Sequence, residues 1–181
     1  FNIYSSIKMP PRGIVQVATC VNQHPDIEVE IIDENNYKGK LDHYELQEKR
    51  PADVVAFYAG MSSIIPRLLS VMRQYKNMEN PPIAIAGGWH ASVMDEELLN
   101  LGIDYIIRGE GEESCLELLE ALFFKKRDVK DIKGLSYKEE KRIVRTEDRA
   151  QIENLDKFPD PDFNLLFNLK HKIIHYTIEL I

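Results

Sequence analysis

Short apolar runs that stop at glycine and lead into a helical pattern recur along this chain, and this alternation constrains its fold more than any other feature. Residues 83–86 read Ile-Ala-Ile-Ala and stop at Gly87-Gly88, and residues 104–108 stop at Gly109. Consecutive parallel strands need a crossover connection, which is usually a helix. The alternation therefore predicts an α/β domain built on a parallel sheet.

Five strands and five helices are predicted over the first 125 residues: strands at residues 1–5, 28–32, 53–58, 83–86 and 104–108, and helices at residues 13–24, 41–49, 64–77, 92–101 and 112–124. The third helix has serine available as an N-cap and Pro66 in its first turn, where proline is tolerated. We expect a doubly wound, five-stranded sheet of the flavodoxin-like or Rossmann-like kind. The pattern does not order the strands, so the flavodoxin-like order 2-1-3-4-5 is adopted as the expectation.

The composition changes after residue 125. Residues 134–137 and 142–145 flank a charged turn and predict a β-hairpin, whereas prolines make residues 158–163 an extended segment. The last residues, 175–181, have the pattern of a strand without a sheet of its own to join. We therefore expect an α/β domain at residues 1–125, a hairpin and connector at residues 126–181, and a following domain that has been cut off.

Charge and cysteine content exclude several classes of function. The net charge of −7 argues against nucleic acid as a partner, because phosphate binding needs a basic surface. Cys20 and Cys115 lie far apart and neither has a Cys-x-x-Cys partner, which argues against an iron–sulfur or zinc site made by this chain. No apolar run approaches membrane-spanning length and no signal peptide is visible, so a cytoplasmic protein is expected.

Loops at the carboxyl ends of parallel strands are where an α/β sheet binds ligands. Gly87 and Gly88 there allow a backbone to lie against a flat ligand, and Ser62 and Ser63 offer hydroxyl groups. Each pair also has a simpler explanation, since two glycines make a tight turn and serines often cap helices.

Four further residues of these loops are open to two interpretations. Glu110 and Glu112 either accept hydrogen bonds from a ligand or serve the start of the helix at residues 112–124. His90 has no second ligand spaced for a metal, so a hydrogen bond to a ligand or to a neighbouring loop is expected. Trp89, the single tryptophan, is a residue type of cores and interfaces, and its place in a loop favours contact with a ligand or a missing domain.

Several segments, taken in order, resemble the N-terminal cobalamin-binding domain of radical S-adenosylmethionine enzymes, and together they cover nearly the whole chain. Each is a weak signal alone, but their common order is specific. The segments are Pro10-Pro11-Arg12-Gly13, residues 30–33, Gly87-Gly88-Trp89-His90-Ala91-Ser92, Gly109-Glu110-Gly111-Glu112 with the strand before it, and the connector pieces at residues 132–137, 152–156 and 158–162.

The resemblance implies a cobalamin-binding module that itself has no catalytic residue and no metal ligand. The implied cofactor-binding residues are Met9, Pro10, Met61, Ser62, Ser63, Gly87, Gly88, Trp89, His90, Gly109, Glu110, Gly111 and Glu112. The family's Cys-x3-Cys-x2-Cys segment, which binds a 4Fe-4S cluster, is absent, as a cut before the catalytic barrel would produce. S-adenosylmethionine and the cluster would thus belong to that missing barrel, and the full-length protein would be a methyltransferase or a cyclase-type enzyme.

One departure from other cobalamin-binding modules concerns the lower face of cobalt. Many such modules supply a histidine through Asp-x-His-x-x-Gly after the first strand, but residues 5–13 contain no histidine. The resemblance then implies cobalamin with its own base displaced and no protein histidine on cobalt. Met9 or a residue of the Met61-Ser62-Ser63 loop is the candidate for the position beneath it.

Two other functions compete with cobalamin binding. The missing histidine motif suits a degenerate domain that binds no cofactor and serves as a docking or regulatory unit. A receiver or flavodoxin fits less well. A receiver needs acids where the chain has Ser5-Ser6 and Tyr58-Ala59, and a flavodoxin needs a Ser/Thr-rich phosphate loop where the chain has residues 7–11.

Overall fold

The computed structural model describes residues 12–169 of the chain, which fall into two compact units. The sheet unit comprises residues 42–158, and the terminal unit comprises residues 1–41 together with residues 159–181. The predicted boundary at residue 125 stays a prediction. Within residues 12–169, no helix combines the length and the apolar character that a membrane span requires.

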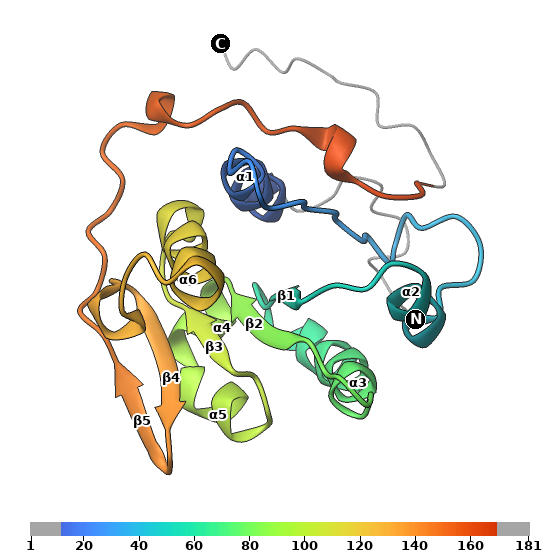
Figure 1. Ribbon diagram of the computed structural model, residues 1–181, viewed down its shortest axis with the longest axis horizontal. Coiled ribbons are helices and arrows are strands. Elements are labelled where there is room, and N and C mark those ends of the chain that lie inside the picture. Colours follow the sequence, from blue (N-terminus) through green and yellow to red (C-terminus); the bar gives the residue numbers. More distant parts are fainter. Residues whose placement is uncertain (1–11, 170–181) are drawn as a thin grey trace. The chain divides into compact units, whose positions relative to one another are not determined.

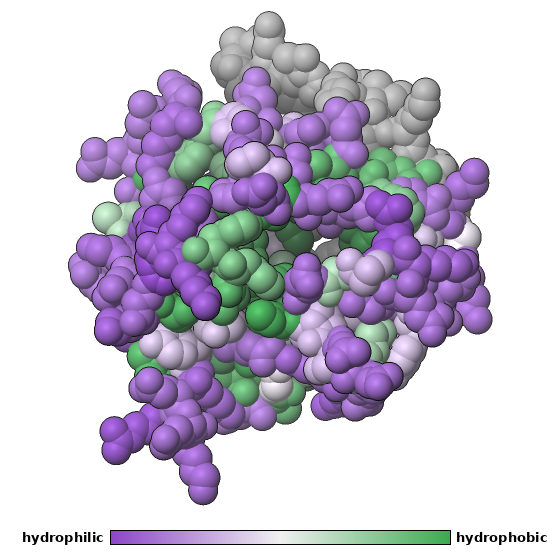
Figure 2. All heavy atoms as spheres, in the orientation of Figure 1, coloured by the Kyte–Doolittle hydropathy of each residue, from purple (hydrophilic) through white to green (hydrophobic). Residues whose placement is uncertain are grey.

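The sheet unit contains a single five-stranded sheet in the order β1-β2-β3-β4-β5 (Figure 1). Strands β1 (Val54–Tyr58), β2 (Ile83–Gly87) and β3 (Tyr105–Ile107) are parallel. Strands β4 (Leu135–Glu139) and β5 (Arg142–Arg145) form a hairpin that adds to β3 in the antiparallel sense. The turn of the hairpin, residues 139–142, is charged, and the end of the hairpin is hydrophilic in Figure 2.

The register of the parallel strands brings their carboxyl ends level with one another. Tyr58 of β1 pairs with Gly87 of β2, which in turn pairs with Ile107 of β3. The loops that follow these three strands therefore start side by side at one edge of the sheet.

The α/β class, the three parallel strands at residues 53–58, 83–86 and 104–108, and the hairpin are confirmed, each strand to within one or two residues. The sheet is mixed rather than wholly parallel, because the hairpin supplies its last two strands. The third, fourth and fifth predicted strands, which the order 2-1-3-4-5 places next to one another, are the observed neighbours β1, β2 and β3.

The predicted strand at residues 28–32 requires a correction, since only Ile31 makes a bridge there, and its partner is Leu166. In the order 2-1-3-4-5 its only neighbour would be the strand predicted at residues 1–5, which lies outside the described residues. Within residues 12–169, that segment therefore has no adjacent strand with which to form a ladder.

The sheet unit has five α-helices and three short 3-10 helices among its residues: α2 (His43–Lys49), α3 (Ile65–Lys76), α4 (Trp89–Val93), α5 (Asp95–Asn100), α6 (Glu112–Phe124), η2 (Ser62–Ile64), η3 (Val129–Asp131) and η4 (Leu155–Lys157). Asp42 caps α2 by accepting hydrogen bonds from the backbone N–H groups of Tyr44 and Glu45. The helix predicted at residues 92–101 begins earlier, at Trp89, and breaks at Met94, whose φ of −114° and ψ of 37° leave the helical region.

Apolar residues of α3, α4 and α5 pack on one face of the sheet, and α6 covers the other (Figure 1). Leu68, Met72, Leu98 and Ile106 are almost fully buried in the first of these layers. Burial of such side chains stabilises a fold by about 2 kcal/mol each.

The terminal unit is built around α1 (Arg12–Val21), the predicted helix after the two prolines. Val15 and Ala18 of α1 pack against Ile31 and Leu166. The side chain of Thr19 donates to the carbonyl of Val15 and accepts from the backbone N–H of Asp162, which precedes η5 (Phe163–Leu165). The extended segment predicted at residues 158–163 is confirmed up to Asp162.

Candidate functional site

Two of the three loops at the carboxyl edge of the sheet, those after β1 and β2, are tied together by backbone hydrogen bonds. The N–H of Ala59, after β1, donates to the carbonyl of Gly87 at 2.7 Å, and the N–H of Ala91 in α4 donates to the carbonyl of Ala59 at 3.2 Å. The loops after β1 and β2 therefore form one continuous surface.

Gly88 is the residue on which this close approach depends. Its φ of +113° is a conformation that side chains rarely allow, and a Cβ there would lie 3.0 Å from the backbone of Ala59 and Gly60. Gly87 differs, because a Cβ on it would meet its nearest neighbour, the carbonyl of Ile107, at an ordinary 3.7 Å. The glycine pair is therefore more than a tight turn, and the constraint falls on its second member.

A cavity of about 510 Å³ opens beside Gly88, between the loop after β1 and the helix α4. Its lining residues are Gly60, Met61, Ser62, Trp89, His90, Val93 and Met94. The side chains of Met61, Trp89, Val93 and Met94 form an exposed apolar rim, and Trp89 is 77% exposed. Large apolar side chains in contact with water at a concave surface are typical of a binding site.

Ser62 and His90 meet at the polar side of this cavity. The hydroxyl of Ser62 lies 3.0 Å from Nδ1 of His90. The other ring nitrogen, Nε2, is buried and has no hydrogen-bond partner among the described residues. The expected hydrogen bond of His90 to a neighbouring loop is confirmed. The expectation that serine caps α3 is wrong, because Ile64 occupies the N-cap position and no side chain caps the helix.

We expect Ser62→Ala to lower the free energy of unfolding by about 0.5–1 kcal/mol, the usual net value of one hydrogen bond. The neighbouring variant Ser63→Ala is the matched control, since Ser63 is also in η2 and makes no side-chain hydrogen bond within residues 12–169. Urea unfolding of both variants measures the difference. Equal midpoints for the two variants would contradict the assignment.

The loop after β3 joins the same edge. The N–H of Gly109, which has a φ of +71°, donates to the hydroxyl of Ser92 at 3.0 Å. The carboxylate of Glu110 accepts from the backbone N–H of Ile152 at 2.6 Å, and Oε2 of Glu112 is buried without a partner. Neither acid caps α6, because Gly111 is its N-cap and no side-chain bond is made there.

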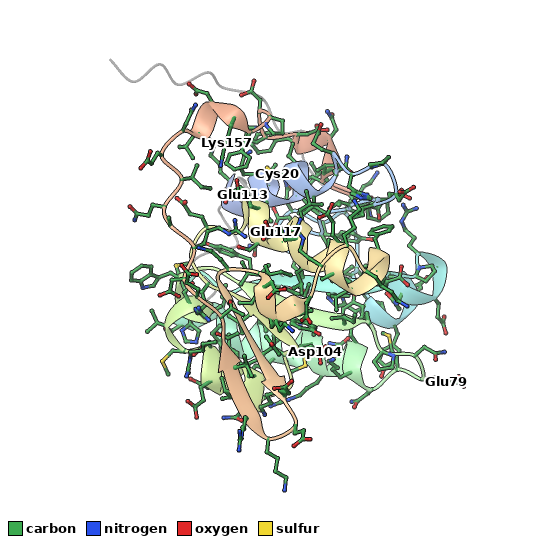
Figure 3. All side chains as sticks on the ribbon, turned by 60° about the vertical axis from the view of Figure 1, so that its left-hand side comes forward. Cys20, Glu79, Asp104, Glu113, Glu117 and Lys157 are labelled. Atoms are coloured by element: carbon green, nitrogen blue, oxygen red, sulfur yellow. The ribbon has the colours of Figure 1, made fainter. Side chains whose placement is uncertain are left out.

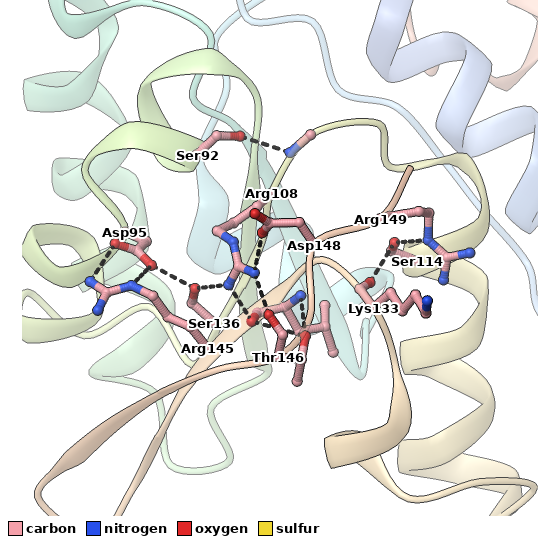
Figure 4. A network of polar contacts seen from close by, with 12 residues as sticks. Ser92, Asp95, Arg108, Ser114, Lys133, Ser136, Arg145, Thr146, Asp148 and Arg149 are labelled. Carbon is pink, nitrogen blue, oxygen red and sulfur yellow. Dashed lines mark hydrogen bonds and ion pairs between the residues drawn. The ribbon is translucent and has the colours of Figure 1, made fainter. Parts of the chain in front are cut away.

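Arg108, which sequence reasoning did not single out, fixes the loop after β3 to the hairpin (Figure 4). Its guanidinium is 11% exposed and donates to the carbonyls of Leu135 and Thr146, to the hydroxyl of Ser136 and to Asp148. An arginine directly after a buried strand was the available signal, since a buried charge must be satisfied by several partners.

The hydroxyl of Ser136 carries this network on to α5. It accepts from Arg108 at 2.6 Å and donates to the carboxylate of Asp95, which also receives two hydrogen bonds from Arg145. Burial alone raises the pKa of Asp95, but the bonds from Arg145, Ser136 and the N–H of Glu96 outweigh burial and hold it below its usual value. A lowered pKa in the folded state adds stability near neutral pH that is lost as the pH falls through that pKa.

A second group of ion pairs ties residues 149–157 to α6. Arg149 donates to Ser114 and Glu113 and also pairs with Glu117. Lys157 pairs with Glu113 at 2.6 Å, and the two lie close together in Figure 3. The hydrogen bond from Lys157 is the main cause that lowers the pKa of Glu113. Burial acts in the opposite direction, and the charges of Lys157 and Arg149 add to the lowering.

A larger cavity, of about 570 Å³, lies at the opposite ends of the strands, and its described lining includes none of the predicted site residues. Its Lys76 and Asp104 pair with each other, and Asp104 also accepts from the backbone N–H of Ala84 at 2.7 Å. Because these charges are satisfied internally, the candidate site remains at the carboxyl edge.

The structure brings most of the predicted site residues together. Met61, Ser62, Trp89 and His90 line the smaller cavity, and Gly88 supports it. Gly109, Glu110, Gly111 and Glu112 lie in the adjoining loop and at the start of α6. Ser63 lies in η2 outside the lining, and Met9 and Pro10 lie outside the described residues.

A family model for the B12 binding domain matches residues 4–119 of the chain. The chain is 30% identical over 167 residues to an uncharacterized methyltransferase of Pyrococcus horikoshii, covering 90% of this chain and 35% of that protein. It is 33% identical over 131 residues to the anaerobic magnesium-protoporphyrin IX monomethyl ester cyclase of Cereibacter sphaeroides, covering 67% of this chain and 20% of that protein. The chain thus spans 35% of the length of the first relative and 20% of the length of the second.

Two solved structures share the fold. The cobalamin-dependent S-adenosylmethionine radical enzyme OxsB, solved with aqua-cobalamin, superposes with a TM-score of 0.71 at 16% identity, covering 91% of this chain and 23% of that chain. The radical S-adenosylmethionine methyltransferase TsrM from Kitasatospora setae gives a TM-score of 0.63 at 21% identity, covering 77% of this chain and 27% of that chain. At these identities the likeness is one of fold.

Proposed function

The chain belongs to the B12-binding domain family, and we propose that it holds cobalamin at the carboxyl edge of the sheet, as a module of a radical S-adenosylmethionine enzyme. The observation that supports this most is the cavity beside Gly88, because it combines a backbone surface without a Cβ, an exposed apolar rim and polar groups in one place. Cobalamin has matching parts, namely a broad apolar ring with amide arms.

The residues of the cavity fit the cofactor on two counts. The missing Cβ of Gly88 lets the loops after β1 and β2 form a smooth surface, against which a flat ring can lie. Nε2 of His90 and Oε2 of Glu112 are buried polar atoms without partners, and such atoms are costly until a hydrogen bond satisfies them. Met61 and Trp89 would contact the ring, and Ser62 would orient His90.

We propose that the cofactor is bound with its own base displaced and with no histidine of this chain on cobalt. His90 is the only histidine that lines the cavity within residues 12–169, and its Nδ1 is engaged with Ser62. We assign to the buried Nε2 of His90 a hydrogen bond to an amide arm or to the nucleotide tail. Among the described residues that line the cavity, Met61 is then the candidate for the position beneath cobalt.

The reaction of the whole protein is a further part of the proposal. Bound cobalamin supplies a cobalt centre that can carry a methyl group. S-adenosylmethionine and a 4Fe-4S cluster would be held by a downstream barrel, the second partner of this module. The relatives are named as a methyltransferase and a cyclase, and either reaction class is compatible with the site.

Titration of the chain with hydroxocobalamin, followed by visible absorption, tests the proposal. We expect saturable binding with a base-displaced spectrum. In Trp89→Ala we expect the affinity for cobalamin to fall about tenfold, because a large apolar contact is lost. Leu155→Ala is the matched control, since Leu155 is also apolar and 66% exposed but does not line the cavity.

Two outcomes would count against the proposal. No binding at high micromolar cobalamin, by the chain and by the full-length protein alike, would favour a degenerate domain that serves in docking. Equal loss of affinity in Trp89→Ala and Leu155→Ala would place the cofactor away from the apolar rim.

A further inference from the structure

We propose that the hydroxyl group of Ser92 is a positioning group that fixes the loop after β2 against the loop after β3, and so sets the shape of the cobalamin site. The inference rests on the proposed function in one respect, which is that these two loops carry the cofactor. The connection between the two loops does not depend on that proposal, because it follows from the hydrogen bonds of Ser92.

Ser92 lies in α4 and makes two hydrogen bonds through one hydroxyl. Its Oγ donates to the carbonyl of Gly88 at 3.0 Å. It also accepts from the backbone N–H of Gly109 at 3.0 Å, the bond drawn from Ser92 in Figure 4. The direction of both bonds is unambiguous, because a carbonyl can only accept and a backbone N–H can only donate. The single proton of the hydroxyl is thus donated to the carbonyl of Gly88, and a lone pair accepts the N–H of Gly109.

The two hydrogen bonds of Ser92 lie just beyond the end of the ladder between β2 and β3. The ladder between β2 and β3 ends at the pair Gly87 and Ile107, so the two loops diverge directly after it. Ser92 connects them again just beyond this pair, at Gly88, one residue after Gly87, and at Gly109, two residues after Ile107. Both are glycines with positive φ, which is the backbone type with the most conformations to lose on ordering.

A common structural role for such a serine is a bond to the carbonyl four residues earlier in its own helix. The bond to Gly88 is of this type, but the bond from Gly109 is not, because Gly109 belongs to a different loop. Gly109 is exposed, so water can replace the lost partner when the hydroxyl is removed. The effect of removal should therefore fall on loop position and cofactor affinity more than on global stability.

Three variants separate the hydroxyl from the volume of the side chain. Ser92→Ala removes the hydroxyl, Ser92→Thr keeps it, and Ser92→Val has the shape of threonine without it. Without any cofactor, we expect the amide of Gly109 to exchange hydrogen about fivefold faster in the alanine and valine variants than in the wild type and the threonine variant.

The second readout is affinity for hydroxocobalamin. We expect about a fivefold or larger loss in Ser92→Ala and Ser92→Val and rescue in Ser92→Thr. Unchanged exchange of Gly109, or wild-type affinity in the valine variant, would overturn the inference. If the wild type itself does not bind, the proposed function fails and the role of Ser92 in a cofactor site fails with it, whereas the exchange measurement still decides whether the hydroxyl joins the loops.

Discussion

Replacing Gly88 with alanine is expected to weaken cobalamin binding about a hundredfold, and Gly88→Trp is expected to abolish it. The φ of +113° with ψ of 177° is a region that only glycine occupies readily, at a cost of about 1–3 kcal/mol for other residues. The added Cβ would also lie 3.0 Å from the backbone of Ala59 and Gly60, so the loops after β1 and β2 must separate. Titration with hydroxocobalamin gives the affinity.

Gly102→Ala is the matched control for this experiment. Gly102 has a nearly identical φ of +112°, but it lies at the opposite ends of the strands, and a Cβ there would meet the flexible side chain of Met72 at 3.5 Å. Both variants should lose stability, and only Gly88→Ala should lose affinity. Equal affinities in the two variants would show that the cofactor does not use the loop of Gly88.

Arg108→Met is expected to lower the free energy of unfolding by about 3 kcal/mol. Methionine retains the length of the stem but leaves the carbonyl of Thr146 and the hydroxyl of Ser136 without the donor that Arg108 supplies. The carbonyl of Leu135 loses one donor and keeps the N–H of Thr146. The pair with Asp148 contributes little to this value, because Asp148 is exposed and surface ion pairs are weak. Urea unfolding measures the change.

Arg142→Met provides the comparison for Arg108, since Arg142 is an exposed arginine on β5 of the same hairpin. Exposed substitutions of this kind usually change stability by about 0.5 kcal/mol or less. A midpoint for Arg108→Met that matches that of Arg142→Met would refute the anchoring role. A loss confined to Arg108→Met would show that the hairpin is held by the end of β3.

Pattern and composition predict the elements of the sheet unit well, and the reason is physical. Near-continuous apolar runs such as residues 83–86 fit a strand that is buried on both faces, and glycine after them marks a loop. The same reasoning assigns residues 28–32 to a strand, because an apolar run records burial and not the partner against which it is buried. Ile31 is indeed buried, but against Leu166 and α1.

The candidate site was predictable as a set of loops but not as a set of contacts. Residue type and position after a strand identify Gly88, Trp89 and His90 in the sequence. The roles of Ser92 and Arg108 depend on residues far along the chain, such as Gly109 and Thr146, which meet them only in the folded structure. Serine and arginine are also common at surfaces, so their type alone does not distinguish a bridge from a solvated side chain.

Because Trp89 is exposed at the cavity, its intrinsic fluorescence can report on binding there. The chain has one tryptophan, so its indole emission comes from a single place, and that place is the rim of the cavity. A strongly absorbing ring that settles against the indole would quench this fluorescence, whereas binding elsewhere would leave it less affected. The arrival and departure of a cofactor can therefore be followed in time on the unlabelled chain, without any probe added to it.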